Sequence, residues 1–494
     1  MSSTKTHPLL LPELVSFLSY NVEPEDLHSC SLVCKTWHTE FNPLVWSTIV
    51  IYNQYGPPRV LIQDIAAHIY HIRKLVYTES VPPEYMSIRC PNLETLKIID
   101  KDWTMSESSW LNVGGIIRES PKLIAIRILA NNRELSEKLW DAIGGSMSVK
   151  VLQLDKVNIP FAHSWSFWRA CTNLEKLEMD GCKVINPWTS LDYFKPLPAS
   201  FPTLQEIKFS GDLRGIGSLQ QLQLAVMCPK LQSLCWIATQ FSREEEQLEP
   251  EQFAGKSIMN LDSLEMREVG QYKDVEYFLT RSEKALKKLV VSGSTYGFPG
   301  FKNLERHFST LQELDFKNFH LRSKAIATLL YSCPFLTIFK AGTVRASDIR
   351  RGETWACADR LSTLLIFFDL EEGNPEVTSR RVFACLAKLT LLQELDLNKN
   401  RKATHEFGGD VEPLRLQLDS GMDQLSTLKC LKRFYFGDYG HKMSMKEGKW
   451  IKNNWKMLEI IHGRFNSDPH HSDRQLTNLF NKEIKRFSRR QLRD

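Results

Sequence analysis

The chain has 494 residues, of which 42% are hydrophobic and 24% charged, and its net charge is +5 at pH 7. This length allows one elongated domain or two to three compact ones, and the composition predicts a packed core. A charge this small on a chain of this length excludes a strongly basic protein and does not favour nucleic-acid binding.

Eleven cysteines are spread along the chain, an odd number with no CxxC pair. This pattern is typical of free thiols in a reducing compartment rather than of a disulfide framework. No apolar run approaches the roughly 18 residues of a membrane-spanning helix. We therefore expect a protein that has no membrane span and resides in the cytoplasm, the nucleus or both.

Residues 8–50 predict a small helical unit. In "LPELVSFL", Pro12 opens a helix that carries Leu14, Phe17 and Leu18 on one face. "PEDLHSCSLVCKTWHTEF" predicts a further helix from Pro24. Its apolar positions at helical spacing are Leu27, Cys30, Cys34 and Trp37. A unit of about 45 residues is too small to be very stable alone, so we expect a partner to cover its apolar side chains.

The same stretch raises the question of a zinc site, because two histidines and two cysteines fall between His28 and His38. On a straight helix, Cys30 and His38 would lie roughly 12 Å apart along the axis. Zinc ligands lie about 2.0–2.3 Å from the metal, so three ligands on one straight helix cannot converge. We therefore expect neither a metal nor a cofactor.

From residue 60 to 470 one motif recurs, with apolar residues at positions a, a+3 and a+5. Copies include "CPNLETLKI", "CTNLEKLEM", "CPKLQSLCW" and "STLQELDF", and most are 25 to 31 residues apart. This period is typical of leucine-rich repeats, in which each unit pairs a short strand with a returning helix. The anchors at position a are Ile72, Leu93, Leu123, Val149, Leu174, Leu204, Leu231, Leu261, Leu286, Leu311, Leu336, Leu361, Leu392, Leu431 and Met457.

One repeat cannot bury its apolar face alone, so neighbouring repeats must stack. We therefore expect an α/β fold, with a three-helix N-terminal unit at residues 8–50 followed by a curved solenoid of about 15 units. The solenoid would span residues 60–470, with a parallel sheet on its concave side and helices on its convex side. Cysteines that recur three residues before an anchor, such as Cys90 and Cys333, are expected to be small buried side chains.

The chain ends in a basic segment, residues 471–494, whose apolar residues recur at roughly helical spacing. It predicts either a cap on the last repeat or a nuclear-import address. Ahead of Leu431, "KNRKATHEFGGD" predicts an inserted loop, and long loops on a rigid scaffold often bind partners.

No catalytic motif stands out. The chain has no GxxxxGK[ST], no HExxH and no GxSxG, and its spacing selects no catalytic set. We therefore expect a protein that is not an enzyme.

Acidic residues occupy the outward strand positions of the later repeats. Water could surround them, or they could line a groove that binds Lys- and Arg-bearing segments of a protein substrate. The predicted substrate contacts are Glu313, Asp315, Glu394 and Asp396.

Residues 8–50 resemble an F-box. The family pattern is Leu-Pro, an apolar helix, Asp-Leu, Val-Cys-x-x-Trp and a later Pro-Leu-x-Trp, and this chain follows it throughout. With its repeats, the chain resembles the F-box/leucine-rich-repeat substrate receptors of SCF-type cullin-RING ubiquitin ligases, and their fungal branch most closely. The residues that the resemblance implies for adaptor binding are Leu11, Pro12, Leu14, Leu18, Leu27, Val33, Cys34, Trp37, Pro43 and Trp46.

The resemblance also implies the partners. The F-box would bind a Skp-type adaptor and, through it, a cullin-RING ligase, while the repeats would hold a protein substrate that the sequence does not identify. The ligase chemistry would belong to other subunits. The alternative is a scaffold that bridges the adaptor to a partner without promoting ubiquitination.

Overall fold

The computed structural model describes most of the chain in two compact units, Met1–Leu231 and Gln232–Asp494. No helix among the described residues has the length and apolar character needed to cross a bilayer. The described residues are 11–19, 21–52, 60–78, 81–100, 105–184, 200–211, 218–237, 258–269, 272–293, 303–317, 319, 321–371, 374–398, 412–437, 443 and 445–463.

The first unit begins with three short helices, α1 (Pro12–Ser19), α2 (Leu27–Ser31) and α3 (Lys35–Val45). Val15 and Phe41 are fully buried and form their core. A single helix from Pro24 is a wrong prediction, because the backbone at Cys34 is extended and separates α2 from α3.

Side chains account for this break. The Ser31 hydroxyl donates to the His28 carbonyl at 2.7 Å, and the His38 ring nitrogen Nδ1 lies 3.2 Å from the Ser31 carbonyl. Carbonyls at the end of α2 thus gain side-chain partners in place of a further helical turn. The straight-helix geometry used above to judge the zinc site therefore does not apply.

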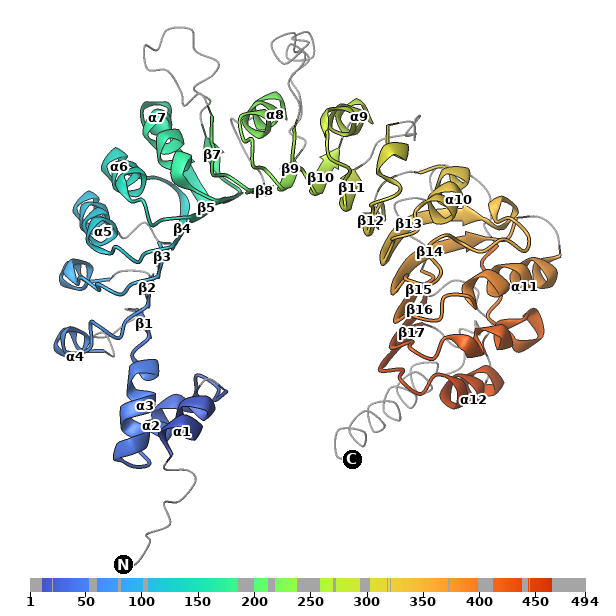
Figure 1. Ribbon diagram of the computed structural model, residues 1–494, viewed down its shortest axis with the longest axis horizontal. Helices are drawn as coiled ribbons and strands as arrows, with labels where there is room; N and C mark the ends of the chain where they lie inside the picture. The colour runs from blue at the N-terminus through green and yellow to red at the C-terminus, as the bar shows by residue number, and fades with distance from the viewer. Residues whose placement is uncertain are drawn as a thin grey trace, which may run out of the picture. The chain divides into compact units, whose positions relative to one another are not determined.

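A parallel sheet follows in the first unit, and helices cover one of its faces (Figure 1). Its strands are β1 (Thr48–Ile51), β2 (Lys74–Thr78), β3 (Thr95–Ile99), β4 (Ala125–Glu134), β5 (Val151–Ile159), β6 (Lys176–Asp180), β7 (Lys183–Val184) and β8 (Glu206–Ser210). Its helices are α4 (Ile62–Ala67), α5 (Glu107–Glu119), α6 (Glu137–Gly145), α7 (Phe161–Ala170) and α8 (Ser218–Val226).

The second unit repeats this arrangement, again with parallel strand pairs. Its strands are β9 (Ser233–Ile237), β10 (Ser263–Val269), β11 (Lys288–Gly293), β12 (Glu313–Asp315), β13 (Ile338–Arg345), β14 (Thr363–Asp369), β15 (Glu394–Asp396), β16 (Arg433–Gly437) and β17 (Ile460–Gly463). Its helices are α9 (Tyr272–Arg281), α10 (Ser323–Ser332), α11 (Pro375–Leu386) and α12 (Met445–Asn454).

The strand register confirms the predicted repeat frame. Equivalent residues of successive repeats are paired, for example Leu289 with Leu314 and Leu314 with Phe339. Every predicted anchor except the last is buried. Met457 is a wrong assignment because it is 46% exposed, whereas its neighbour Leu458 is buried and stands two residues before β17, as the other anchors do before their strands.

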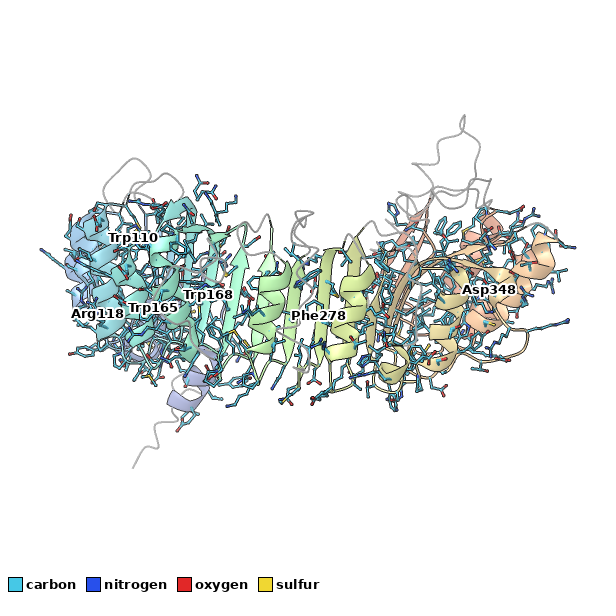
Figure 2. All side chains as sticks on the ribbon, turned by 90° about the horizontal axis from the view of Figure 1, so that it is seen from above. Trp110, Arg118, Trp165, Trp168, Phe278 and Asp348 are labelled. Carbon is cyan, nitrogen blue, oxygen red and sulfur yellow. The ribbon has the colours of Figure 1, made fainter. Side chains whose placement is uncertain are left out.

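Aromatic residues fill the space between the helices and the sheet in the first unit. Trp110 on α5, Trp140 on α6 and Trp168 on α7 are buried, and Figure 2 labels the first and last of them. The rings of Trp140 and Phe167 meet edge to face with centroids 5.1 Å apart, a favourable arrangement for aromatic pairs. The helical layer is therefore packed core, which leaves the opposite face of the sheet, hereafter the open face, for binding.

The recurring cysteines are buried, as predicted. Cys90, Cys171, Cys228 and Cys333 are all free and buried. Burial raises the pKa of the Cys90 thiol to about 11 and that of Cys333 to about 12. Thiols that stay protonated at neutral pH are poor nucleophiles and poor metal ligands.

The boundaries of the predicted domains stay predictions. Residues 471–494, whether a cap or an import address, lie outside the described residues, as does most of the "KNRKATHEFGGD" insertion.

Candidate functional site

Exposed apolar side chains gather on the three N-terminal helices. Phe17 on α1 is 68% exposed, and Leu32 and Val33, between α2 and α3, are 69% and 62% exposed. Leu11 and Leu14 are exposed as well. We call these five residues the apolar patch. Large apolar side chains gathered at one site on a small helical unit mark a surface that a partner covers.

The predicted adaptor residues fall into two groups. Leu11, Leu14 and Val33 belong to the apolar patch, and Pro12 begins α1. The half-buried residues are Leu18, Leu27, Cys34, Trp37, Pro43 and Trp46. Exposed members can touch a partner directly, whereas half-buried members also hold the three helices together. No contact with an adaptor is present, so the assignment of all ten stays a prediction.

The two tryptophans have internal partners. Trp37 stacks on Phe41, with ring centroids 5.2 Å apart. Trp46 stacks on His68, which follows α4, with centroids 4.0 Å apart and ring planes 4° from parallel. Trp46 therefore joins the three helices to the first repeat.

Phe17 and Leu32 are missing from the residues assigned by resemblance. The sequence does contain a signal for Phe17, because it follows Leu14 by three residues and shares its helix face. It contains none for Leu32, whose exposure depends on the break between α2 and α3.

The helical unit continues directly into the repeat sheet. Strand β1 begins three residues after α3 ends and pairs in parallel with β2. The Ser47 carbonyl accepts the backbone N–H groups of Arg73 at 2.9 Å and Lys74 at 2.8 Å. Because the first strand of the sheet is attached to the last helix of the F-box-like unit, the apolar patch and the first repeats form one body.

The four acids predicted as substrate contacts lie on the open face, each beside a basic side chain of the same chain. Lys288 lies 3.0 Å from Glu313, and Lys340 lies 3.0 Å from Asp315. Arg433 lies 2.7 Å from Glu394. Lys317 lies 3.9 Å from Asp396. A basic ligand would have to compete with these cations, and contact with the four acids stays a prediction.

In the part of the chain that the structure describes, no group of three or more His, Cys, Asp or Glu side chains could hold a metal ion. Near the opening motif, His38 contacts the Ser31 carbonyl as noted above, and Cys30 and Cys34 are half-buried.

His307 is the one fully buried histidine among the described residues. Its Nδ1 accepts the backbone N–H of Leu286 at 3.0 Å, which requires the neutral ring. Burial, aided by the nearby Arg306, lowers the pKa of His307 to about 4. It thus holds the turn before β11 in place as long as it is unprotonated.

This predicts a loss of stability in mild acid. The unfolded chain takes up a proton on His307 below pH 6.5, whereas the folded chain resists until about pH 4. The stabilisation should therefore be complete above pH 6.5 and fall as the pH drops to 4, by up to about 3 kcal/mol. Urea midpoints at pH 7.5 and 5 should differ less in His307→Asn, which keeps an acceptor without the titration. An equal pH dependence in both proteins would contradict the assignment.

Comparison with known proteins identifies the N-terminal unit. Residues 12–52 match the family described as F-box-like. No curated protein matches the chain. Among solved structures, the yeast Rad7 and Elc1 complex matches with 12% identity and a TM-score of 0.40, over 74% of this chain and 91% of that chain.

The Drosophila Toll–Spatzle complex also matches, with 13% identity and a TM-score of 0.39, over 85% of this chain and 54% of that chain. Its glycosylated form gives 12% identity and 0.40, over 85% and 55%. This chain thus spans about half the length of those chains. The match at residues 12–52 coincides with the three helices and β1, and parallel strands continue the repeat frame behind them. The chain therefore carries an F-box-like domain at its N-terminus, and its architecture is that of an F-box/leucine-rich-repeat protein.

Proposed function

We propose that the protein is the substrate-recognition subunit of an SCF-type E3 ubiquitin ligase. In this proposal the apolar patch binds a Skp-type adaptor, the adaptor links the chain to a cullin, and the open face of the repeats holds a protein substrate. The chain itself catalyses nothing, because the ligase chemistry belongs to other subunits. The observation that carries the proposal is the apolar patch on a three-helix unit that matches the F-box-like family.

The junction with the repeats supports the same function. A receptor must hold its substrate at a set position relative to the adaptor, and direct pairing of β1 with β2 provides such a connection. The stacked rings of Trp46 and His68 brace it. A floppy linker at this place would leave the substrate free to move relative to the adaptor.

Co-purification with a Skp-type adaptor tests the proposal. The full chain should form a stable complex, and Leu14→Asp/Val33→Asp should abolish it, because both charges would be buried without partners at the interface. Val377→Asp is the matched control, since Val377 on α11 is 64% exposed and lies outside the F-box-like domain. A double variant that folds and still co-purifies would contradict adaptor binding through this patch.

Ubiquitin transfer separates receptor from scaffold. The purified complex, joined to a cullin-RING core, should transfer ubiquitin to proteins captured on the repeats. A complex that assembles and captures proteins, yet never promotes transfer to any of them, would favour the scaffold that bridges the adaptor to a partner.

A further inference from the structure

Two cations lie directly opposite each other on the open face of the first unit. Lys97 on β3 is paired in register with Arg127 on β4, and Lys74 projects from the neighbouring β2. The open-face positions of these three strands carry no carboxylate. Like charges directly opposite one another destabilise a sheet. Some gain outside folding must offset that cost.

Elsewhere on the open face, cations stand beside acids. Lys176 lies 2.9 Å from Glu206 on the paired strand, and the later repeats match Lys288, Lys340 and Arg433 with acids in the same way. Opposite charges on neighbouring strands stabilise a sheet. The cations of β2–β4 depart from this pattern. Among the described residues, neither Lys74 nor Arg127 has a carboxylate within ion-pair distance.

Acids limit this cationic surface on one side. Asp155 on β5 lies in register with Asp180 on β6. Burial, and next the Asp180 carboxylate, raise the pKa of Asp155, while Arg127 acts in the opposite direction. A nucleic-acid strand that crossed these strands would meet the two acids after leaving the cations. Nucleic-acid grooves need a continuous basic track along the backbone, so a short anionic ligand fits better.

Apolar side chains flank the cations. Ile99 and Leu129 are paired in register one step beyond Lys97 and Arg127 and are half-buried. Val50, on β1, is exposed. Neighbouring strands lie about 4.8 Å apart and residues along an extended segment about 3.3 Å apart. Two acids, adjacent or one residue apart, could therefore contact both cations while an apolar neighbour covers Ile99 and Leu129.

We propose that the open face of β2–β4 binds a short acidic and apolar segment of the substrate protein, with its carboxylates over Lys97 and Arg127. The inference rests on the proposed receptor function and specifies the chemistry of the substrate. Such a site explains why the like charges are retained, because a bound carboxylate pairs with each of them. It also lies in the same unit as the apolar patch, on strands joined to it through β1.

Peptide binding to the full chain tests the proposal. The probe is a fluorescein-labelled peptide of glutamate and leucine, compared with a peptide in which glutamine replaces glutamate. We expect salt-sensitive binding of the acidic peptide and at least about tenfold weaker binding of the glutamine peptide, which corresponds to roughly 1.4 kcal/mol. Equal binding of the two peptides would overturn the proposal.

Charge reversal locates the site. Lys97→Glu/Arg127→Glu should weaken the acidic peptide at least tenfold, and Lys340→Glu/Arg433→Glu, an equal change of charge in the second unit, should not. Equal loss in both variants would indicate nonspecific attraction and overturn the proposal. A single-stranded DNA oligonucleotide that binds more tightly than the peptide through Lys97 and Arg127 would overturn the choice of partner.

A neutral variant excludes misfolding as the cause. Lys97→Gln/Arg127→Gln removes a like-charge repulsion, so it should unfold at the same urea concentration as the wild type or at a higher one, while losing peptide affinity. Full affinity in this variant would overturn the proposal. Adaptor co-purification, measured in parallel, should be unchanged in all these variants. Failure of adaptor binding in the wild type would contradict the proposed function and leave the peptide result standing.

Discussion

The Arg133→Ala variant is expected to lose about 3–5 kcal/mol of stability, because it leaves a buried carboxylate without its cation. Asp100, the residue after β3, is fully buried, and its carboxylate lies 2.9 Å from the Arg133 guanidinium. The Asp100 backbone N–H donates to the Leu129 carbonyl at 2.8 Å, which fixes the acid beside β4. Urea unfolding of the full chain, followed by tryptophan fluorescence, measures the loss in the first unit.

An exposed pair in the same unit provides the control. Arg73 and Glu94 lie 2.7 Å apart, but both side chains are exposed. Water and salt screen such a pair, so Arg73→Ala should cost less than about 1 kcal/mol. If the two variants lose the same stability, the Asp100–Arg133 pair does not act as a buried ion pair. The double variant Asp100→Leu/Arg133→Met should recover much of the loss, because no charge is then left buried.

The sequence does not reveal this pair, and the reason is local backbone geometry. Asn131 and Asn132 adopt positive φ angles of 39° and 65°. They produce a bulge in β4, between Leu129 and Arg133, that returns Arg133 toward Asp100. Asparagine tolerates the left-handed region better than most residues, but no repeat pattern indicates where a bulge forms. Thirty-three residues separate the two charges in sequence, and only the register of stacked strands brings them together.

Other features were predictable because they follow from periodicity. Burial of the anchors from Ile72 to Leu431 repeats in every unit, so the frame predicted both the strands and the core. The frame failed at Met457, where Met457 and Leu458 are both apolar and either could serve as the anchor. Pairing of Glu313 and Glu394 with cations was not predicted either. The repeats vary in length, so outward side chains had been considered one strand at a time rather than across neighbouring strands.

For the F-box-like domain, the spacing of residues indicated its identity better than its shape. Cys34 fits a helical spacing with Trp37 in sequence, yet in the structure it precedes α3 in an extended conformation. The break exposes Leu32 and Val33 together. Side-chain hydrogen bonds at Ser31 and His38 decide where α2 ends, and helix-spacing rules do not include such bonds. The apolar patch could therefore be only partly predicted.

The structure thus ranks the residues of the domain by their effect on adaptor affinity. Phe17→Ala and Leu32→Ala should each weaken binding by about 2 kcal/mol, or roughly 30-fold, because large exposed side chains at the centre of an interface contribute most to affinity. Trp46→Ala should act differently. Its ring stacks on His68, so its loss should lower stability at the junction and leave adaptor affinity less affected.

Isothermal titration of the purified full chain with a recombinant Skp-type adaptor measures these affinities, and thermal unfolding measures stability. Val377→Ala, which truncates an equally exposed side chain on α11, should change neither. If Phe17→Ala and Leu32→Ala match this control while Trp46→Ala abolishes binding, the adaptor contacts the junction and not the apolar patch. The opposite order would mean that the helices carry the affinity and Trp46 supports the joint. We expect that order because Phe17 and Leu32 extend into solvent, whereas both faces of the Trp46 ring cannot be free when one is stacked on His68.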